Sequence, residues 1–177
     1  MSSDLKTVYW DACVPLSYIN GTADRISDIE GLLQQSGKDL QIITSVFTVT
    51  EVAFAKVEQD AKVLDSEVEA KISTLWQVGS PIQLVEFYEV IAARARELMR
   101  AAIPHGWRLK PGDAIHLATA DHMKVAEMHT YDEALHKYQE LTYTKFPICQ
   151  PIAAQANIVF DAQQADKGPN ETNEPNQ

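Results

Sequence analysis

The segment KPGDAIHLATADHM, residues 110–123, constrains the fold more than any other part of the sequence. Pro111 and Gly112 precede a single acid, Asp113, and the residues that follow are apolar almost all round. A helix without a polar face belongs inside a protein, so the rest of the chain must fold around it. An unpaired carboxylate at the start of such a helix would be costly, so Asp113 should have a specific environment.

Short apolar or β-branched runs alternate with helical patterns along the whole chain. We expect strands at 7–10, 40–46, 82–87 and 124–131, and a last one near 147–150. The intervening segments predict helices from Val14 to Gly21, over 23–36, 48–62 and 65–78, from the end of the third strand to about Ile103, and over 111–123 and 133–139. This alternation is typical of an α/β fold with a parallel sheet covered by helices on both faces.

The composition favours one ordinary domain. The 177 residues can bury a good core, and no apolar run is long enough to span a bilayer. The N-terminus lacks the pattern of a secretory signal, and two widely separated cysteines suggest a reducing compartment, so we expect a cytoplasmic protein. We predict one domain over 1–160. The tail, 161–177, has no branched aliphatic or aromatic residue, which predicts disorder.

The formal net charge of −10 argues against clamping nucleic acid by overall charge. It leaves room for a local basic patch, and for a cluster of acids whose repulsion is relieved by a bound cation.

Four acids are expected near the carboxyl ends of the strands, where ligands bind in open α/β sheets. Asp11 follows the first strand, Glu51 is expected in the first turn of the helix after the second, Asp113 opens the apolar helix, and Asp132 follows the fourth strand. If they converge, a hard divalent cation such as Mg²⁺ or Mn²⁺ would suit their oxygens.

Helix capping is the simpler alternative for each acid taken singly. Acids in first turns accept hydrogen bonds from free N–H groups and oppose the helix dipole. The residues TVTE, 48–51, fit a capping box with Thr48 as N-cap and Glu51 at its third helical position. Asp113 and Asp132 could also cap helices, but four such acids together favour a shared site.

The motifs VYWDACV, TVTEVAF, GDAIHLATA and HTYDEAL together resemble the PIN-domain ribonucleases, which include VapC-type toxins. The resemblance runs from about Thr7 to Ile152. It implies a three-layer α/β/α sandwich with a central parallel sheet of four to five strands. It also implies that the acids bind one or two Mg²⁺ or Mn²⁺ ions, and that the metal activates a water for attack on an RNA phosphodiester. Thr130 matches a hydroxyl residue that assists this site.

Two further groups are candidates for the site. His116 lies one helical turn after Asp113 and could support that acid by a hydrogen bond, although a satisfied core histidine is the simpler reading. A basic cluster precedes Asp113 and could contact phosphates; its members are Arg94, Arg96, Arg100, Arg108 and Lys110. The alternative is a solvated helix face on which these cations pair with Glu89 and Glu97.

The leading hypothesis is a Mg²⁺- or Mn²⁺-dependent endoribonuclease, the toxin of a type II toxin–antitoxin module. Its partners would be RNA and a small antitoxin that lays a segment across the site, and a homodimer would fit the family. A stand-alone PIN nuclease acting in RNA processing or on DNA is one alternative. A PIN-fold module that binds without cutting is the other.

Overall fold

The computed structural model describes residues 5–153 and contains one parallel sheet. Its five strands have the order β3-β2-β1-β4-β5, and every adjacent pair is parallel. The strands are β1 (Lys6–Trp10), β2 (Leu40–Ser45), β3 (Ile82–Val85), β4 (Glu127–His129) and β5 (Ile148–Cys149). The predicted α/β class and the strand number are confirmed. The predicted disordered tail, 161–177, lies outside the described residues.

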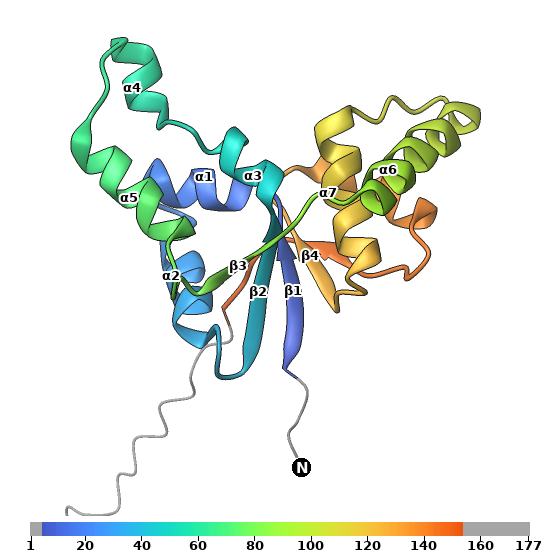
Figure 1. Ribbon diagram of the computed structural model, residues 1–177, viewed down its shortest axis with the longest axis horizontal. Helices are drawn as coiled ribbons and strands as arrows, with labels where there is room; N and C mark the ends of the chain where they lie inside the picture. The colour runs from blue at the N-terminus through green and yellow to red at the C-terminus, as the bar shows by residue number, and fades with distance from the viewer. Residues whose placement is uncertain (1–4, 154–177) are drawn as a thin grey trace, which may run out of the picture.

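Helices cover both faces of the sheet, which confirms the three-layer arrangement (Figure 1). The helices that pack on one face are α1 (Cys13–Ile19), α2 (Ile26–Gln35) and α5 (Ser66–Trp76). Those on the other are α6 (Glu89–Ala102), α7 (Pro111–His122) and the 3₁₀-helix η2 (Glu133–Leu141), with a short 3₁₀ turn, η1 (Ile103–His105), after α6. Each face therefore has its own hydrophobic core.

The central strand β1 serves both cores. Val8 and Trp10 are buried against α1, α2 and α5, whereas Tyr9 is buried on the side of α6 and α7. This is the alternation that a strand imposes on successive side chains. Because parallel strands place their carboxyl ends at the same edge, Asp11 leaves β1 at the edge where β2 and β4 also end.

Helix α7 is buried along nearly all of its length, as its composition predicts. The side chains from Ala114 to Asp121 are buried except for Ile115, which is partly buried, and the helix packs against α6 and β2. Helix α6 is amphipathic instead, with its buried residues Ile91, Ala95, Leu98 and Ala102 spaced three or four apart. The N-terminus of α7 thereby reaches the carboxyl edge of the sheet.

The single helix predicted over 48–62 is wrong. The chain forms α3 (Val46–Glu51) and α4 (Lys56–Ala61), separated by the residues 52–55. The Glu58 carboxylate accepts hydrogen bonds from the N–H groups of Ala55 (2.9 Å) and Asp65 (2.7 Å), which starts a new helix and turns the chain after it. In Figure 1, α4 projects away from the sheet.

The capping box predicted at 48–51 is also wrong. Ser45 is the N-cap of α3, and its hydroxyl accepts a hydrogen bond from the N–H of Phe47 (3.2 Å). The buried Thr48 hydroxyl instead lies 2.7 Å from that of Thr44. Glu51 is therefore the last residue of α3, not a residue of its first turn.

Two smaller differences concern the C-terminal part. Strand β4 is shorter than the predicted 124–131, because Lys124 adopts a positive φ of 51° that extended backbone does not allow. The helix predicted at 133–139 is the 3₁₀-helix η2. Among the described residues, no helix combines the length and the apolar character needed to cross a membrane.

Candidate active site

Asp11 is the most constrained acid of the site. It lies at the end of β1, 5% exposed, and its backbone N–H donates to the His129 carbonyl (3.2 Å). One carboxylate oxygen accepts from the backbone N–H (3.1 Å) and the thiol (2.7 Å) of Cys13, and the other from the Thr130 hydroxyl (2.6 Å). Burial raises the pKa of Asp11, although these donors oppose the shift. Its position and orientation are therefore fixed.

Thr130 connects Asp11 with Asp132. Thr130 and Asp132 both follow β4. The Thr130 hydroxyl donates a hydrogen bond to Asp11 and accepts one from the Asp132 N–H (2.9 Å). Asp132 is exposed and caps η2 by accepting from the N–H of Ala134 (2.9 Å). Asp132 thus has the capping role that the sequence left open, and it stands at the rim of the same edge.

Glu51 is oriented by a buried histidine. His116 Nε2 lies 2.7 Å from a carboxylate oxygen of Glu51, and His116 Nδ1 lies 2.8 Å from the Tyr9 hydroxyl. The Tyr9 hydroxyl also accepts a hydrogen bond from the N–H of Ser45 (3.2 Å). His116 is therefore a satisfied core histidine, and the acid it contacts is Glu51 rather than Asp113.

Asp113 is half-buried in the first turn of α7, and no described residue donates a hydrogen bond to its carboxylate. Burial raises its pKa; Lys110 and His116 oppose this, and repulsion from Asp132 and Asp11 adds to it. Asp113 is therefore a carboxylate with no donor, placed among other acids.

The start of α7 also brings Glu51 close to Asp113. A Cβ atom on Gly112 would lie only 3.2 Å from a Glu51 carboxylate oxygen, so glycine permits this approach. The four acids thus share one edge of the sheet. Among the described residues, however, no three of them offer oxygens that all lie within 4.8 Å of one another. The four carboxylates therefore surround a common space without forming a compact ligand cluster.

The five basic residues of the predicted cluster fall into two groups. A hollow of about 490 Å³ next to α6 and the start of α7 is lined by four of them: Arg96, Arg100, Arg108 and Lys110. Arg94 lies elsewhere: its guanidinium donates to the buried Asp121 carboxylate (2.9 and 3.1 Å) and to the Leu141 carbonyl, and it stacks over the Tyr143 ring. Arg94 is therefore committed to internal contacts.

Sequence reasoning missed two residues that the structure adds to the site, Tyr9 and Cys13. Cys13 donates to Asp11 and accepts a hydrogen bond from the N–H of Tyr131 (3.0 Å). Burial and the neighbouring Asp11 raise the pKa of this thiol to about 12, so it is protonated. The only available signals were the position of Cys13, two residues after the acid, and that of Tyr9 on an alternating strand.

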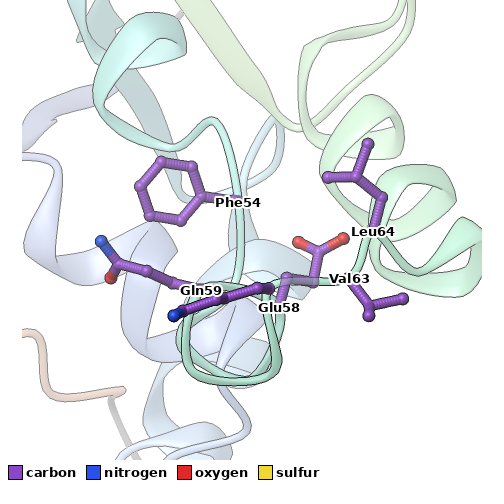
Figure 2. A pocket seen from close by; sticks show the side chains of 6 residues that line it. Phe54, Glu58, Gln59, Val63 and Leu64 are labelled. Carbon is purple, nitrogen blue, oxygen red and sulfur yellow. The ribbon is translucent and has the colours of Figure 1, made fainter.

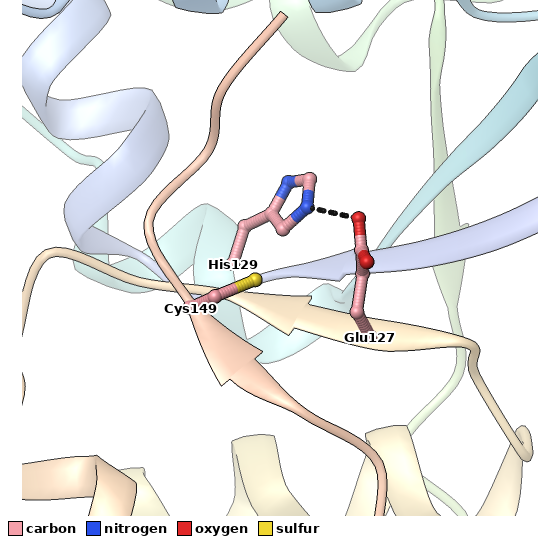
Figure 3. A group of neighbouring side chains, drawn as sticks. All are labelled: Glu127, His129 and Cys149. Carbon is pink, nitrogen blue, oxygen red and sulfur yellow. Dashed lines mark hydrogen bonds and ion pairs between the residues drawn. The ribbon is translucent and has the colours of Figure 1, made fainter. Parts of the chain in front are cut away.

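A second group of potential metal ligands lies on the face of the sheet opposite to α6 and α7, on the side of Trp10 (Figure 3). Glu127, His129 and Cys149 offer atoms within 4.8 Å of one another. Trp10 Nε1–H donates to His129 Nδ1 (3.0 Å), so Nε2 carries the proton and donates to Glu127 (2.8 Å). Lys6 pairs with the same carboxylate (2.8 Å). This closed chain of donors and acceptors leaves His129 no free lone pair for a cation.

Helix α4 carries a separate apolar hollow of about 250 Å³ (Figure 2). In Figure 2, Phe54 and Leu64 lie on either side of the Glu58 carboxylate, and Val63 lies on the same side as Leu64. Leu64 is 87% exposed, which is unusual for a large apolar side chain. None of the four acids lines this hollow.

The PIN domain family model matches residues 8–141 of the chain. No curated protein matches the sequence. Among solved structures, VapBC2 from Rickettsia felis bound to a promoter DNA fragment aligns with a TM-score of 0.60 and 14% identity, over 80% of this chain and 96% of that chain. FitAcB from Neisseria gonorrhoeae aligns with a TM-score of 0.57 and 15% identity, over 81% and 97%. The sarcin-ricin loop cleaving toxin VapC20 from Mycobacterium tuberculosis aligns with a TM-score of 0.52 and 12% identity, over 72% of this chain and 92% of that chain. At these identities, the likenesses show the fold.

Proposed function

This chain belongs to the PIN-domain family, and from that premise we propose that it is a metal-dependent endoribonuclease, the toxin of a toxin–antitoxin module. The observation that carries the proposal is the gathering of Asp11, Glu51, Asp113 and Asp132 at the carboxyl edge of the sheet. Helix capping explains only Asp132. It does not explain why Asp113 has no hydrogen-bond donor, or why the Asp11 carboxylate is buried.

The donor set fits a hard divalent cation. Mg²⁺ and Mn²⁺ prefer carboxylate oxygens, and Asp113 has lone pairs that no described donor uses. Repulsion from Asp132 and Asp11, which helps to raise the pKa of Asp113, would be relieved by a bound cation. Asp11, Glu51, Asp113 and Asp132 are the proposed ligands of one or two ions.

The residues of the site have different roles in this proposal. When bound, the metal would supply an activated water and stabilise charge on the phosphate. Thr130 and Cys13 orient Asp11, and His116 orients Glu51, through hydrogen bonds present without any ligand. The ligands are thus held near their working positions before substrate arrives, which lowers the ordering cost of binding.

The toxin assignment rests on the relatives. The Rickettsia felis structure is VapBC2 bound to a promoter DNA fragment, and the Mycobacterium tuberculosis protein, VapC20, is a toxin that cleaves the sarcin-ricin loop. We propose that this chain likewise cleaves RNA and is inhibited by a small antitoxin, with a homodimer as the working unit. Action on DNA and binding without cleavage are outcomes that the following assay separates. A stand-alone nuclease of RNA processing would also cut RNA, and it differs from a toxin in having no inhibiting partner.

The test is cleavage of labelled single-stranded RNA and DNA in the presence of Mg²⁺ or Mn²⁺. The wild-type protein should cut RNA, and Asp11→Asn and Asp113→Asn should each lower the rate by at least about a hundredfold. Cleavage that survives both substitutions would place the activity at another site or in a contaminant. A wild-type protein that cuts neither nucleic acid would be a binding module.

A further inference from the structure

Four cations converge on one hollow whose lining contains no acid. The side chains of Arg96, Arg100, Arg108 and Lys110 line it and are exposed, and no acid is among its lining residues. Within residues 5–153, no side chain or carbonyl accepts a hydrogen bond from their charged groups. Glu97, which the sequence offered as a partner for the five cations, pairs with Arg94 (3.2 Å) and with the Tyr143 hydroxyl, so this alternative holds for Arg94 and not for the four cations of the hollow.

This arrangement is unusual for the chain as a whole. The protein has 25 acids and only 15 lysines and arginines. Several of the other cations are engaged: Lys6 pairs with Glu127, and Arg25 lies over the Tyr131 ring. A cluster of unpaired cations in so acidic a protein repels itself, so an anionic ligand would relieve a real electrostatic cost.

The hollow adjoins the proposed metal site. Pro111, the first residue of α7, lines it, and Asp113 lies two residues further on in the same turn. The charge of Lys110 is close enough to lower the pKa of Asp113. A polyanion lying in the hollow would therefore continue directly toward the acids.

The apolar part of the lining indicates which polyanion. Met99, Ile103 and Trp107 line the same hollow, Ile103 is 67% exposed, and the Trp107 ring is held by stacking on His105 at 4.6 Å between centroids. Cations beside apolar and aromatic groups suit a single strand, whose phosphates and unpaired bases are both accessible. In a duplex the bases are stacked and paired, so their faces could not reach these apolar groups.

We propose that this basic groove, lined by Arg96, Arg100, Arg108 and Lys110, binds the backbone of single-stranded RNA next to the scissile phosphate. The proposal rests on the proposed nuclease function for its substrate, but the groove itself can be tested without cleavage. Its cations contact phosphates, and Met99 and Ile103 pack against bases. The groove would lower KM for long substrates and leave the chemical step unchanged.

The experiment measures the affinity of a fluorescent single-stranded RNA of about 15 nucleotides by anisotropy, with Asp11→Asn as the background. Arg96→Gln/Arg100→Gln should weaken binding about tenfold and lower the slope of log K against log salt by about 1.4. The matched control is Lys38→Gln/Lys56→Gln, which changes the net charge equally on exposed residues away from the groove. It should change the affinity less than about twofold.

The same measurement compares single-stranded RNA, DNA of the same sequence, and an RNA duplex, so that unpaired and paired strands are separated. Ile103→Ser should weaken both single strands and leave the duplex unaffected, because only unpaired bases reach the apolar wall. Equal losses for groove and control variants would overturn the proposal in favour of overall charge. Unchanged RNA affinity in the groove variant would also overturn it and would favour an acidic protein partner.

The nuclease and groove proposals can fail separately. In protein with an intact Asp11, the groove variant should raise KM for the long RNA and keep kcat. Cleavage with an unchanged KM would refute the groove alone. If the wild-type protein cuts nothing, but the groove variant still loses RNA binding, the nuclease proposal alone would be refuted.

Discussion

His116 donates from Nε2 to the Glu51 carboxylate across 2.7 Å, and the strand behind it determines that direction. Burial raises the pKa of the Tyr9 hydroxyl far above its ordinary value, so it keeps its proton. Since that hydroxyl already accepts from the Ser45 N–H, it donates to His116 Nδ1. The imidazole must then hold its proton on Nε2. Tyr9 therefore sets the tautomer with which His116 orients Glu51.

A first prediction concerns substitutions of His116. The Asn side chain can replace only Nδ1, whereas the Gln amide reaches the position of Nε2. His116→Asn should weaken Mn²⁺ binding by about tenfold, and His116→Gln should retain most of it, because outer hydrogen bonds orient metal-binding groups. Calorimetric titration with Mn²⁺ checks this without any cleavage.

The chain offers a matched control for that experiment in His129. This second buried histidine also bridges an aromatic donor and a glutamate, Trp10 at 3.0 Å and Glu127 at 2.8 Å, on the opposite face of the sheet. His129→Asn should lower the free energy of unfolding by about as much as His116→Asn and leave the Mn²⁺ affinity unchanged. Equal loss of affinity in both variants would mean that His116 acts through the fold rather than through Glu51.

A second prediction concerns the coupling of Asp113 to stability. Because Asp113 is repelled by neighbouring acids, Asp113→Asn should leave the melting temperature unchanged or raise it when no divalent cation is present. Mn²⁺ at ten times its dissociation constant should stabilise the wild type by about 1.4 kcal/mol, or about 4 °C. The variant should show no such shift at the same concentration. A lower melting point in metal-free buffer would argue that Asp113 is a structural cap.

A third prediction concerns Asp121, the buried partner of Arg94. Burial alone would raise its pKa, but hydrogen bonds from the N–H groups of Tyr143 and Thr144, together with Arg94, lower it on balance. At pH 7, Asp121→Asn should reduce the free energy of unfolding by about 2–3 kcal/mol, because it breaks a buried charged pair.

The pH dependence of that loss has a definite sign. The pKa of Asp121 is lower in the folded protein than in the unfolded chain, so its stabilisation is present above pH 4 and is lost as the pH falls through the folded pKa. The difference between wild type and Asp121→Asn should shrink at about pH 3. Urea unfolding at both pH values measures it, with the exposed Asp39→Asn as control. A gap that stays constant would show that the carboxylate charge is not the source.

The sequence predicted well what depends on neighbours along the chain. The apolar character of α7 and the β-branched runs indicated buried elements, and the order of strands and helices predicted the layers. It failed where a capping side chain overrides the hydrophobic period. The helix is interrupted at residues 52–55, where the Glu58 carboxylate accepts hydrogen bonds from the N–H groups of Ala55 and Asp65, and hydrophobic periodicity does not contain that information.

The candidate site divides in the same way. The four acids were predicted from their expected places after strands or in first helical turns, although Glu51 ends α3 instead of opening a helix. The contacts of His116 with Glu51 and of Arg94 with Asp121 were not, since these partners lie 65 and 27 positions apart in the sequence. The pairing of Arg94 with Glu97, three residues away, was among the expected alternatives. Helical spacing indicated which cations could share a face, but only packing showed that Arg94 leaves the group that lines the groove.

The central strand leaves no room for an insertion. Tyr9 and Trp10 are consecutive, yet each completes a different histidine bridge on a different face. One added residue in β1 would turn both rings to the wrong side and displace Asp11 by about 3.3 Å. Length variation within 6–10 should therefore abolish folding and metal affinity together.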